Sequence, residues 1–170
     1  MAHASFLSPL GPLSVYADDH AVIRVGWHPA TCGILTPLVR AAIEELEAYF
    51  DGTLQTFASP VRLTGTPYQR RAWQAIAAIP YGAVASYADL ARQLDSGPRA
   101  IASACARNRL PIFIPCHRVI ASGGGLGGYS GGEGLKTKTA LLELEHTHKL
   151  EPEQGAASGS GHTLTTEEAL

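Results

Sequence analysis

The first part of the chain alternates apolar and polar residues in a pattern that predicts two short strands. These strands cover about residues 13–16 and 22–27, and Asp18-Asp19 between them is typical of a hairpin turn. Residues 60–63 predict a further short strand or a linker. A small antiparallel unit is therefore expected near the start of the chain.

A helix is predicted between the hairpin and residue 60. Thr36 followed by Pro37 combines a side-chain cap with a first-turn proline. Apolar residues then recur at helical spacing as far as Phe50, and Gly52 can end the helix. Strands and helix together indicate a small α/β module over residues 1–63.

The middle of the chain predicts three short helices. The first begins at Pro67, Ser86 caps the second, and the third begins at Pro98 and runs to about Asn108. A tight glycine-containing turn joins the last two helices, which is typical of a helix-turn-helix.

An apolar run follows the third helix. Residues 112–114 predict a buried strand that Pro115 ends, so that Cys116 is presented at its tip. A glycine-rich loop at 122–132 and a last helix over about 138–146 complete this part.

The end of the chain differs in composition. From Pro152 it is rich in Gly, Ser, Glu and Thr, which favours disorder. We therefore divide the chain into the α/β module at 1–63, a helix-turn-helix domain at 64–150 and a disordered tail at 151–170.

Charge is distributed unevenly over these three parts. Residues 1–63 carry three Arg against six Asp/Glu, residues 64–150 carry ten Lys/Arg against five Asp/Glu, and residues 151–170 carry four Glu without a Lys or Arg. A basic segment between acidic flanks is compatible with a nucleic-acid surface. A solvated face with a chance imbalance explains the same numbers.

The remaining composition indicates an intracellular protein. No apolar run approaches the roughly 20 residues of a membrane helix, and no secretory signal pattern begins the chain. The cysteines are Cys32, Cys105 and Cys116, an odd number at wide spacings that argues against a disulfide framework. We expect a cytoplasmic protein, or a nuclear one if the source is a eukaryote.

Cys116 is the main candidate for chemistry. It lies between Pro115 and the pair His117-Arg118. A nearby cation lowers the pKa of a thiol, and the thiolate is the reactive form. A buried structural cysteine is the alternative, because free cysteines are often buried.

The third predicted helix consists mainly of small residues. Its alanines, Ser103 and Cys105 lie between Arg99 at the front and Arg107 at the back. A helix about 10–12 Å across enters a minor groove about 6 Å wide only if its side chains are small and the DNA is deformed. Close packing against a neighbouring helix would also favour small residues.

The glycine-rich loop predicts no nucleotide cofactor. Residues 122–132 lack the Gly-Lys-Ser/Thr ending of a P-loop and the spacing of a dinucleotide fingerprint. A pliable pocket wall, whose backbone amides approach a flat ligand closely, fits better. We expect no cofactor.

The chain closely resembles the O6-alkylguanine-DNA alkyltransferase (methylated-DNA–protein-cysteine methyltransferase) family. The matching segments run in family order from about residue 6 to residue 147. They are Ser8–Gly11, Tyr49–Gly52, Gly65–Gln69, Ile79–Gly82, Ser86-Tyr87, Asn108 with Pro111, Ile114–Ile120, Gly128–Gly132 and Lys138–Glu145. The resemblance implies an α+β fold, with a ribonuclease H-like module followed by a winged helix-turn-helix domain.

The resemblance implies single-turnover repair of double-stranded DNA by a monomer. An alkylated guanine is flipped out through the minor groove, and its O6-alkyl group moves irreversibly to Cys116. His117 is implied as the base, acting through a water, and Glu145 as the residue that orients it. Tyr87 is implied as the donor to the departing guanine.

Other residues match positions that bind DNA or substrate in the family. Arg99 matches the arginine that replaces the flipped base, and Asn108 matches the asparagine that braces the active-site turn. The further expected binding residues are Ser103, Pro111, Arg118, Val119, Tyr129 and Ser130.

The sequence departs from the family pattern at several positions. Asp18 occupies the position of a cysteine that binds structural zinc in some relatives, so we expect no metal. Arg109 replaces a common proline. The loop before Arg99 is shorter than in many relatives, and a small insertion precedes Lys138.

Two other functions remain as alternatives. An alkyltransferase-like lesion sensor would bind damaged DNA without transfer, but such relatives lack the reactive cysteine that is present here as Cys116. A thiol-based regulator or a cysteine hydrolase on a winged helix is the second alternative, and a hydrolase would turn over many times.

Overall fold

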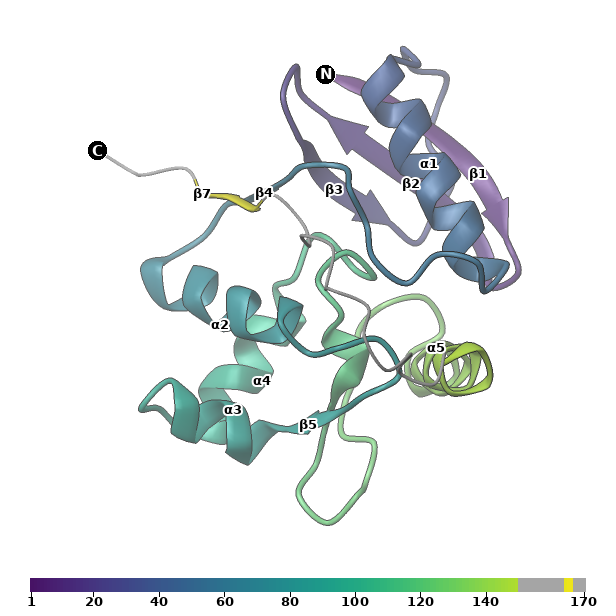
Figure 1. Cartoon of the computed structure of the whole chain (residues 1–170). Helices are drawn as coiled ribbons and strands as arrows, with labels where there is room; N and C mark the ends of the chain where they lie inside the picture. Colours follow the sequence, from purple (N-terminus) through teal and green to yellow (C-terminus); the bar gives the residue numbers. More distant parts are fainter. Residues whose placement is uncertain (150–163, 167–170) are drawn as a thin grey trace, which may run out of the picture.

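The computed structural model describes residues 1–149 and the backbone of residues 164–166. It is a mixed α/β structure (Figure 1). In chain order its elements are β1 (Ala2–Ser8), β2 (Gly11–Ala17), β3 (Val22–Gly26), α1 (Pro37–Phe50), β4 (Val61–Leu63), α2 (Pro67–Ala77), β5 (Ala85–Ser86), α3 (Tyr87–Gln93), α4 (Pro98–Ala106), a 3₁₀ turn (Cys116–Arg118), β6 (Val119–Ile120), α5 (Leu135–His148) and β7 (Leu164–Thr166).

The first sheet contains the predicted hairpin and a strand that the sequence did not reveal. β2 and β3 pair antiparallel, and Asp18 closes the turn between them by accepting from the amides of His20 and Ala21 at 2.8 and 2.9 Å. β1 was missed, and it pairs antiparallel along the whole of β2. The strand order is β1-β2-β3-β4-β7, with β4 parallel to β3.

Helix α1 lies across one face of this sheet (Figure 1). The predicted cap is present, since the Thr36 hydroxyl accepts from the amide of Val39 at 3.4 Å. Ala42, Leu46 and Tyr49 follow on the buried face of the helix with no exposed surface. The apolar spacing therefore places Tyr49 at the inner end of α1, which faces the rest of the molecule.

Helices α2, α3 and α4 form the second part (Figure 1). Thr66 and Gln69 make a reciprocal capping box at the start of α2, and Ser86 caps α3. The indole of Trp73 in α2 donates to the carbonyl of Ala104 in α4 at 2.9 Å. All three helices were predicted, although α4 ends at Ala106, two residues before the predicted end.

The predicted strand before the active thiol is wrong. Ile112, Phe113 and Ile114 are buried, but they form a tight loop in which Ile112 has a φ of +74°. The amide of Ile114 donates to the carbonyl of Leu110 at 2.8 Å, and Cys116 then begins the 3₁₀ turn. The run is apolar because the loop lies in the core, so hydrophobicity alone misled the assignment.

The predicted tail lies mostly outside the described residues, because 150–163 and 167–170 are not described. Within it, where we expected no regular structure, Leu164–Thr166 form β7 and pair in parallel with β4. Among residues 1–149 and 164–166, no helix has the length and apolar character required to cross a membrane.

Candidate active site

Cys116 lines a cavity of about 400 Å³. The residue is 5% exposed. The other residues lining the cavity are Tyr87, Ala102, Cys105, Ala106, Gly128, Tyr129 and Ser130. The fold therefore brings three predicted site residues, Tyr87, Tyr129 and Ser130, to the predicted nucleophile.

Asn108 holds the loop that carries the thiol. Its side-chain nitrogen donates to the carbonyl of Ile114 at 2.8 Å and to Cys116 Sγ at 3.1 Å. Its oxygen accepts from the amide of Leu110 at 2.9 Å. One amide side chain thus spans the whole loop, which is the bracing geometry that the resemblance implied.

His117 and Glu145 form a buried pair directly behind the thiol. His117 Nε2 lies 2.8 Å from Glu145 Oε1, and neither side chain is more than 1% exposed. The hydroxyl of Tyr49 on α1 also donates to Glu145 Oε1, at 3.0 Å. The N-terminal part of the chain thereby contacts the carboxylate that pairs with His117.

The protonation state of this pair follows from its surroundings. Burial alone would raise the pKa of Glu145, but hydrogen bonds from His117 and Arg118 outweigh burial and lower this pKa to about 2. Glu145 is therefore a carboxylate at neutral pH and can only accept hydrogen bonds. It follows that His117 carries its proton on Nε2.

The other ring nitrogen of His117 is free to accept a proton. Burial lowers the pKa of His117 despite the opposing effect of Glu145, so the imidazole is neutral near pH 7. Its Nδ1 atom is buried and has no hydrogen-bond partner in the described part of the chain. A neutral imidazole with an unshared Nδ1 lone pair is the form that acts as a general base.

Cys116 requires such a base. A hydrogen bond with the Cys105 thiol, together with burial, raises the pKa of Cys116 well above its usual value. The thiol is therefore protonated at rest. This corrects the sequence-based expectation that the neighbouring cation lowers the pKa of this thiol.

The position of Arg118 explains why its charge does not lower the pKa of Cys116: the guanidinium is paired with Glu145 and does not line the pocket. Its guanidinium donates to both carboxylate oxygens of Glu145 at 2.7–3.1 Å and to the carbonyl of Ile79 at 2.7 Å. It also lies 5.6 Å from the centre of the Tyr81 ring and is 6% exposed. The structure thus places Arg118 in a buried ion pair rather than at a DNA or substrate surface.

Lys138 is a site residue that the sequence reasoning missed. It has no exposed surface, and its ammonium donates to the carbonyls of Val119 and Gly128 at 2.6 and 3.1 Å. The Tyr87 hydroxyl donates to the same Gly128 carbonyl at 3.4 Å. The available signal was spacing, since Lys138 and Glu145 are seven residues apart on one helical face.

The remaining predicted residues lie in three different places. Pro111 borders a smaller cavity of about 130 Å³ that Cys116 also lines. Val119 is fully buried, and its carbonyl accepts a hydrogen bond from Lys138. Arg99 and Ser103 are exposed on α4, outside the pocket lining. The exposed residues of α4 are Pro98, Arg99, Ala102, Ser103 and Ala106, and the exposed Arg107 follows directly after the helix.

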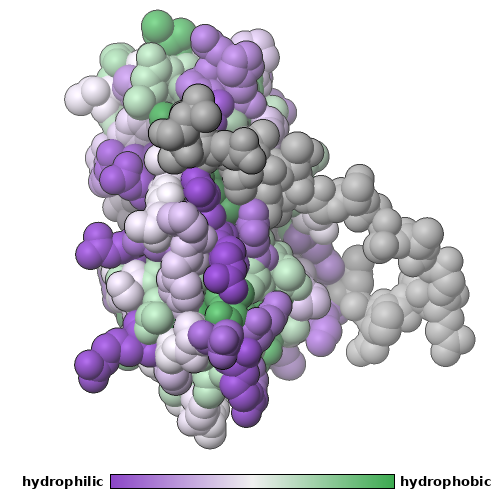
Figure 2. All heavy atoms as spheres, turned by 90° about the vertical axis from the view of Figure 1, so that its left-hand side faces the viewer, coloured by the Kyte–Doolittle hydropathy of each residue, from purple (hydrophilic) through white to green (hydrophobic). Residues whose placement is uncertain are grey.

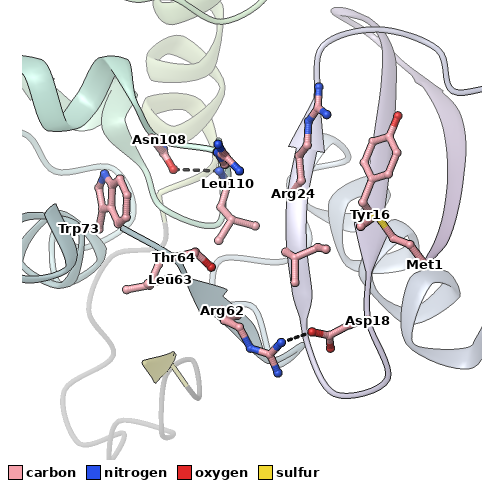
Figure 3. A pocket seen from close by; sticks show the side chains of 12 residues that line it. Met1, Tyr16, Asp18, Arg24, Arg62, Leu63, Thr64, Trp73, Asn108 and Leu110 are labelled. Atoms are coloured by element: carbon pink, nitrogen blue, oxygen red, sulfur yellow. Dashed lines mark hydrogen bonds and ion pairs between the residues drawn. The ribbon is translucent and has the colours of Figure 1, made fainter. Parts of the chain in front are cut away.

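A third cavity, of about 360 Å³, lies between β3 and the loop after α4 (Figure 3). Arg24, Arg62 and Arg109 line it, and Arg62 forms an ion pair with Asp18. Cys116 is not among its lining residues. Asp18, the predicted departure from the zinc-binding pattern, thus forms part of a turn and an ion pair.

The outer face of the molecule beside α2 and α3 is mainly hydrophilic. Figure 2 shows hydrophilic side chains projecting over much of this face, with small apolar patches between them.

The described residues contain no group of three His, Cys, Asp or Glu side chains able to hold a metal ion.

Comparisons with known proteins agree on one family. Residues 67–147 match the family model described as "6-O-methylguanine DNA methyltransferase, DNA binding domain". The methylated-DNA–protein-cysteine methyltransferase of Mycobacterium leprae is 40% identical over 81% of this chain and 88% of that protein. The constitutive enzyme of Bacillus subtilis is 45% identical over 81% of this chain and 91% of that protein.

A solved structure is also similar over most of the chain. The crystal structure of Mycobacterium tuberculosis OGT in complex with DNA has a TM-score of 0.77 to this chain and is 34% identical to it. The match covers 87% of this chain and 94% of that one. The similarity therefore extends over both parts of the fold described above.

Proposed function

Because the chain belongs to the methylated-DNA–protein-cysteine methyltransferase family, we propose that it repairs DNA by transferring an alkyl group from O6-alkylguanine to Cys116. The observation that carries the proposal is the pairing of a pocket thiol with a neutral histidine. Cys116 opens into the cavity of about 400 Å³, and His117 beside it has an unshared Nδ1.

The transfer begins with loss of the thiol proton. His117 Nδ1 accepts the proton of Cys116 through a bridging water, and the carboxylate of Glu145 stabilises the imidazolium that forms. The resulting thiolate attacks the alkyl carbon, the bond from that carbon to O6 breaks, and the electron pair remains on the guanine. The product is a thioether, which water does not readily cleave, so each molecule reacts once.

Tyr87 suits the role of donor to the guanine as it leaves. Burial raises the pKa of Tyr87, so the phenol stays protonated at neutral pH. Its hydroxyl lies in the same cavity as Cys116 and donates weakly to the Gly128 carbonyl at 3.4 Å. A flipped base can take over this donor as negative charge develops on the guanine.

The DNA surface is proposed on α4. Two arginines lie at the ends of its exposed face, and the residues between them are small. Ala102 and Ala106 also line the cavity, so the helix borders the entrance to the thiol. Insertion of this helix into a minor groove, with Arg99 in the place of the flipped base and Ser103 facing the backbone, would bring the base to Cys116.

We propose the finer description of the fold on the same basis. The sheet with α1 corresponds to the ribonuclease H-like module at 1–63, and α2–α4 with the loop after β6 correspond to the winged helix-turn-helix domain at 64–150. We also propose that the protein acts as a monomer in the cytoplasm, or in the nucleus of a eukaryotic source, where its thiol stays reduced.

The test is to incubate the protein with a duplex that contains one O6-methylguanine and to measure the mass of the intact chain. We expect one added methyl group on the peptide that contains Cys116, a reaction that stops at one equivalent, and no transfer in Cys116→Ser. Cys32→Ser, which changes an exposed cysteine, is the matched control and should react normally. Tight lesion binding without a mass change would instead indicate a lesion sensor, and repeated turnover would indicate a hydrolase.

A further inference from the structure

A second thiol lies beside the nucleophile, and the proposed repair reaction does not use it. Cys105 is on α4, one residue before the helix ends, and is partly exposed. Cys105 and Cys116 both line the cavity of about 400 Å³ and the smaller one of about 130 Å³, and each thiol shifts the pKa of the other. Two cysteines that the sequence separates by ten residues are therefore neighbours in one pocket wall.

Two cavities lie beside the cysteine pair. Cys105 and Cys116 line both of them, and their volumes are about 400 and 130 Å³. A cavity of roughly 10–15 Å³ already admits one water molecule. A molecule of hydrogen peroxide, with only two oxygens, therefore fits in either cavity.

The surroundings also favour a thiolate within the pair. The Lys138 ammonium acts on both cysteines and favours the charged form of each. The hydrogen bond from Cys116 lowers the pKa of Cys105, against the opposing effect of burial. The more exposed sulfur is thus the one that first reacts with an oxidant.

We propose that Cys105 and Cys116 are an oxidation site for peroxides and form a reversible disulfide that protects the alkyl-accepting sulfur. The Cys105 thiolate attacks one peroxide oxygen, the O–O bond breaks, and hydroxide leaves and becomes water on protonation. The Cys116 sulfur then attacks the resulting sulfenic acid, and its proton and the sulfenic hydroxyl leave as a second water. One peroxide and two thiols give one disulfide and two waters.

The bond joins two residues that line the same two cavities. The two sulfurs must approach each other to a bond length of about 2.05 Å. Asn108 holds the loop that carries Cys116, and helix α4 carries Cys105. The backbone of both cysteines is therefore held in place before the bond forms. A lone active-site thiol would instead proceed to sulfinic acid, which thiol reductants do not reverse.

The test counts free thiols in the full-length protein. Reduced protein is treated with hydrogen peroxide, quenched under denaturing conditions, labelled with a maleimide and mapped by peptide mass. We expect the labelled cysteines to fall from three to one, with Cys32 still labelled and a Cys105–Cys116 crosslink recovered. Methyl transfer from an O6-methylguanine duplex should fall at least tenfold and return after dithiothreitol.

Two variants make the outcome decisive. In Cys105→Ser and Cys105→Ala, excess peroxide should convert Cys116 to sulfinic acid, and dithiothreitol should no longer restore transfer. Circular dichroism verifies that each variant is folded, and Cys32→Ser, the exposed-cysteine control, should behave like the parent protein.

The proposal is overturned if Cys105 stays labelled after Cys116 is lost, if the crosslink joins Cys32 instead, or if no thiol is lost. The thiol map requires no DNA. Absence of methyl transfer in untreated protein would therefore refute the repair function and leave the disulfide result standing.

Discussion

Replacement of Glu145 by Gln tests the buried ion pair behind the thiol. Glu145 has no exposed surface and accepts hydrogen bonds from Tyr49, His117 and Arg118. In Glu145→Gln the guanidinium of Arg118 loses its counter-charge while it remains buried. Removal of one partner of a buried ion pair costs about 3–5 kcal/mol.

The pKa of Glu145 gives a second value for the same cost. This pKa is about 2 in the folded protein and about 4.3 in an unfolded chain, a difference of roughly two units at 1.36 kcal/mol each, or about 3 kcal/mol. Because the folded pKa is the lower one, this stabilisation is present above about pH 4.3 and is lost as the pH falls toward 2. Both values indicate a loss of about 3 kcal/mol in the variant at pH 7.

The assay is urea unfolding of both proteins at pH 7 and at decreasing pH. We expect Glu145→Gln to lower the free energy of unfolding by about 3 kcal/mol at pH 7 and to lose less stability than the parent below about pH 4.3. Glu143→Gln changes an exposed glutamate on the same helix and should stay within about 0.5 kcal/mol. The reasoning fails if Glu145→Gln lies within 1 kcal/mol of the parent, or if both proteins lose stability in parallel below pH 4.3.

Three further predictions concern the pocket. Tyr87→Phe should slow methyl transfer by about 10–100-fold in single-turnover assays while lesion binding is retained, because one donor is lost; an unchanged rate would exclude this donor. Gly131→Ala should lower both the transfer rate and the melting temperature, since a Cβ would lie 2.5 Å from Trp27 Nε1; unchanged values would show that the loop yields freely. Lys138→Met should destabilise the fold by about 1–3 kcal/mol, because the buried carbonyl of Val119 loses its Lys138 donor; urea unfolding measures this, and a loss below 1 kcal/mol would contradict it.

The helices could be predicted from the sequence because their signals are local. Thr36 and Ser86 act as caps within three residues of the groups they bind. Prolines at the first helical positions and apolar residues on one face complete each signal. The strand β1 was missed because its pairing partner β2, rather than its own composition, gives it a strand conformation.

The chemistry of the site could be predicted only in part, because it depends on contacts between distant segments. Cys116 and His117 are adjacent in sequence, and the resemblance supplied Glu145. The charge of Arg118 was expected to act on the thiol, but a partner 27 residues later binds it instead. No local pattern reveals that Tyr49, 96 residues before Glu145, reaches the same carboxylate.

The hydrogen bonds that Glu145 accepts from Tyr49, His117 and Arg118 therefore link the stability of the fold to the reactivity of the Cys116 thiol. Glu145 receives donors from Tyr49 on α1 and from His117 and Arg118 in the 3₁₀ turn. The same bonds that keep Glu145 ionised fix the proton of His117 on Nε2 and leave Nδ1 as the base. A change that weakens any of these donors would both destabilise the buried carboxylate and reduce the ability of His117 to ionise Cys116. Stability and transfer rate should consequently fall together in variants that remove a donor to Glu145, whereas Tyr87→Phe should lower the transfer rate alone.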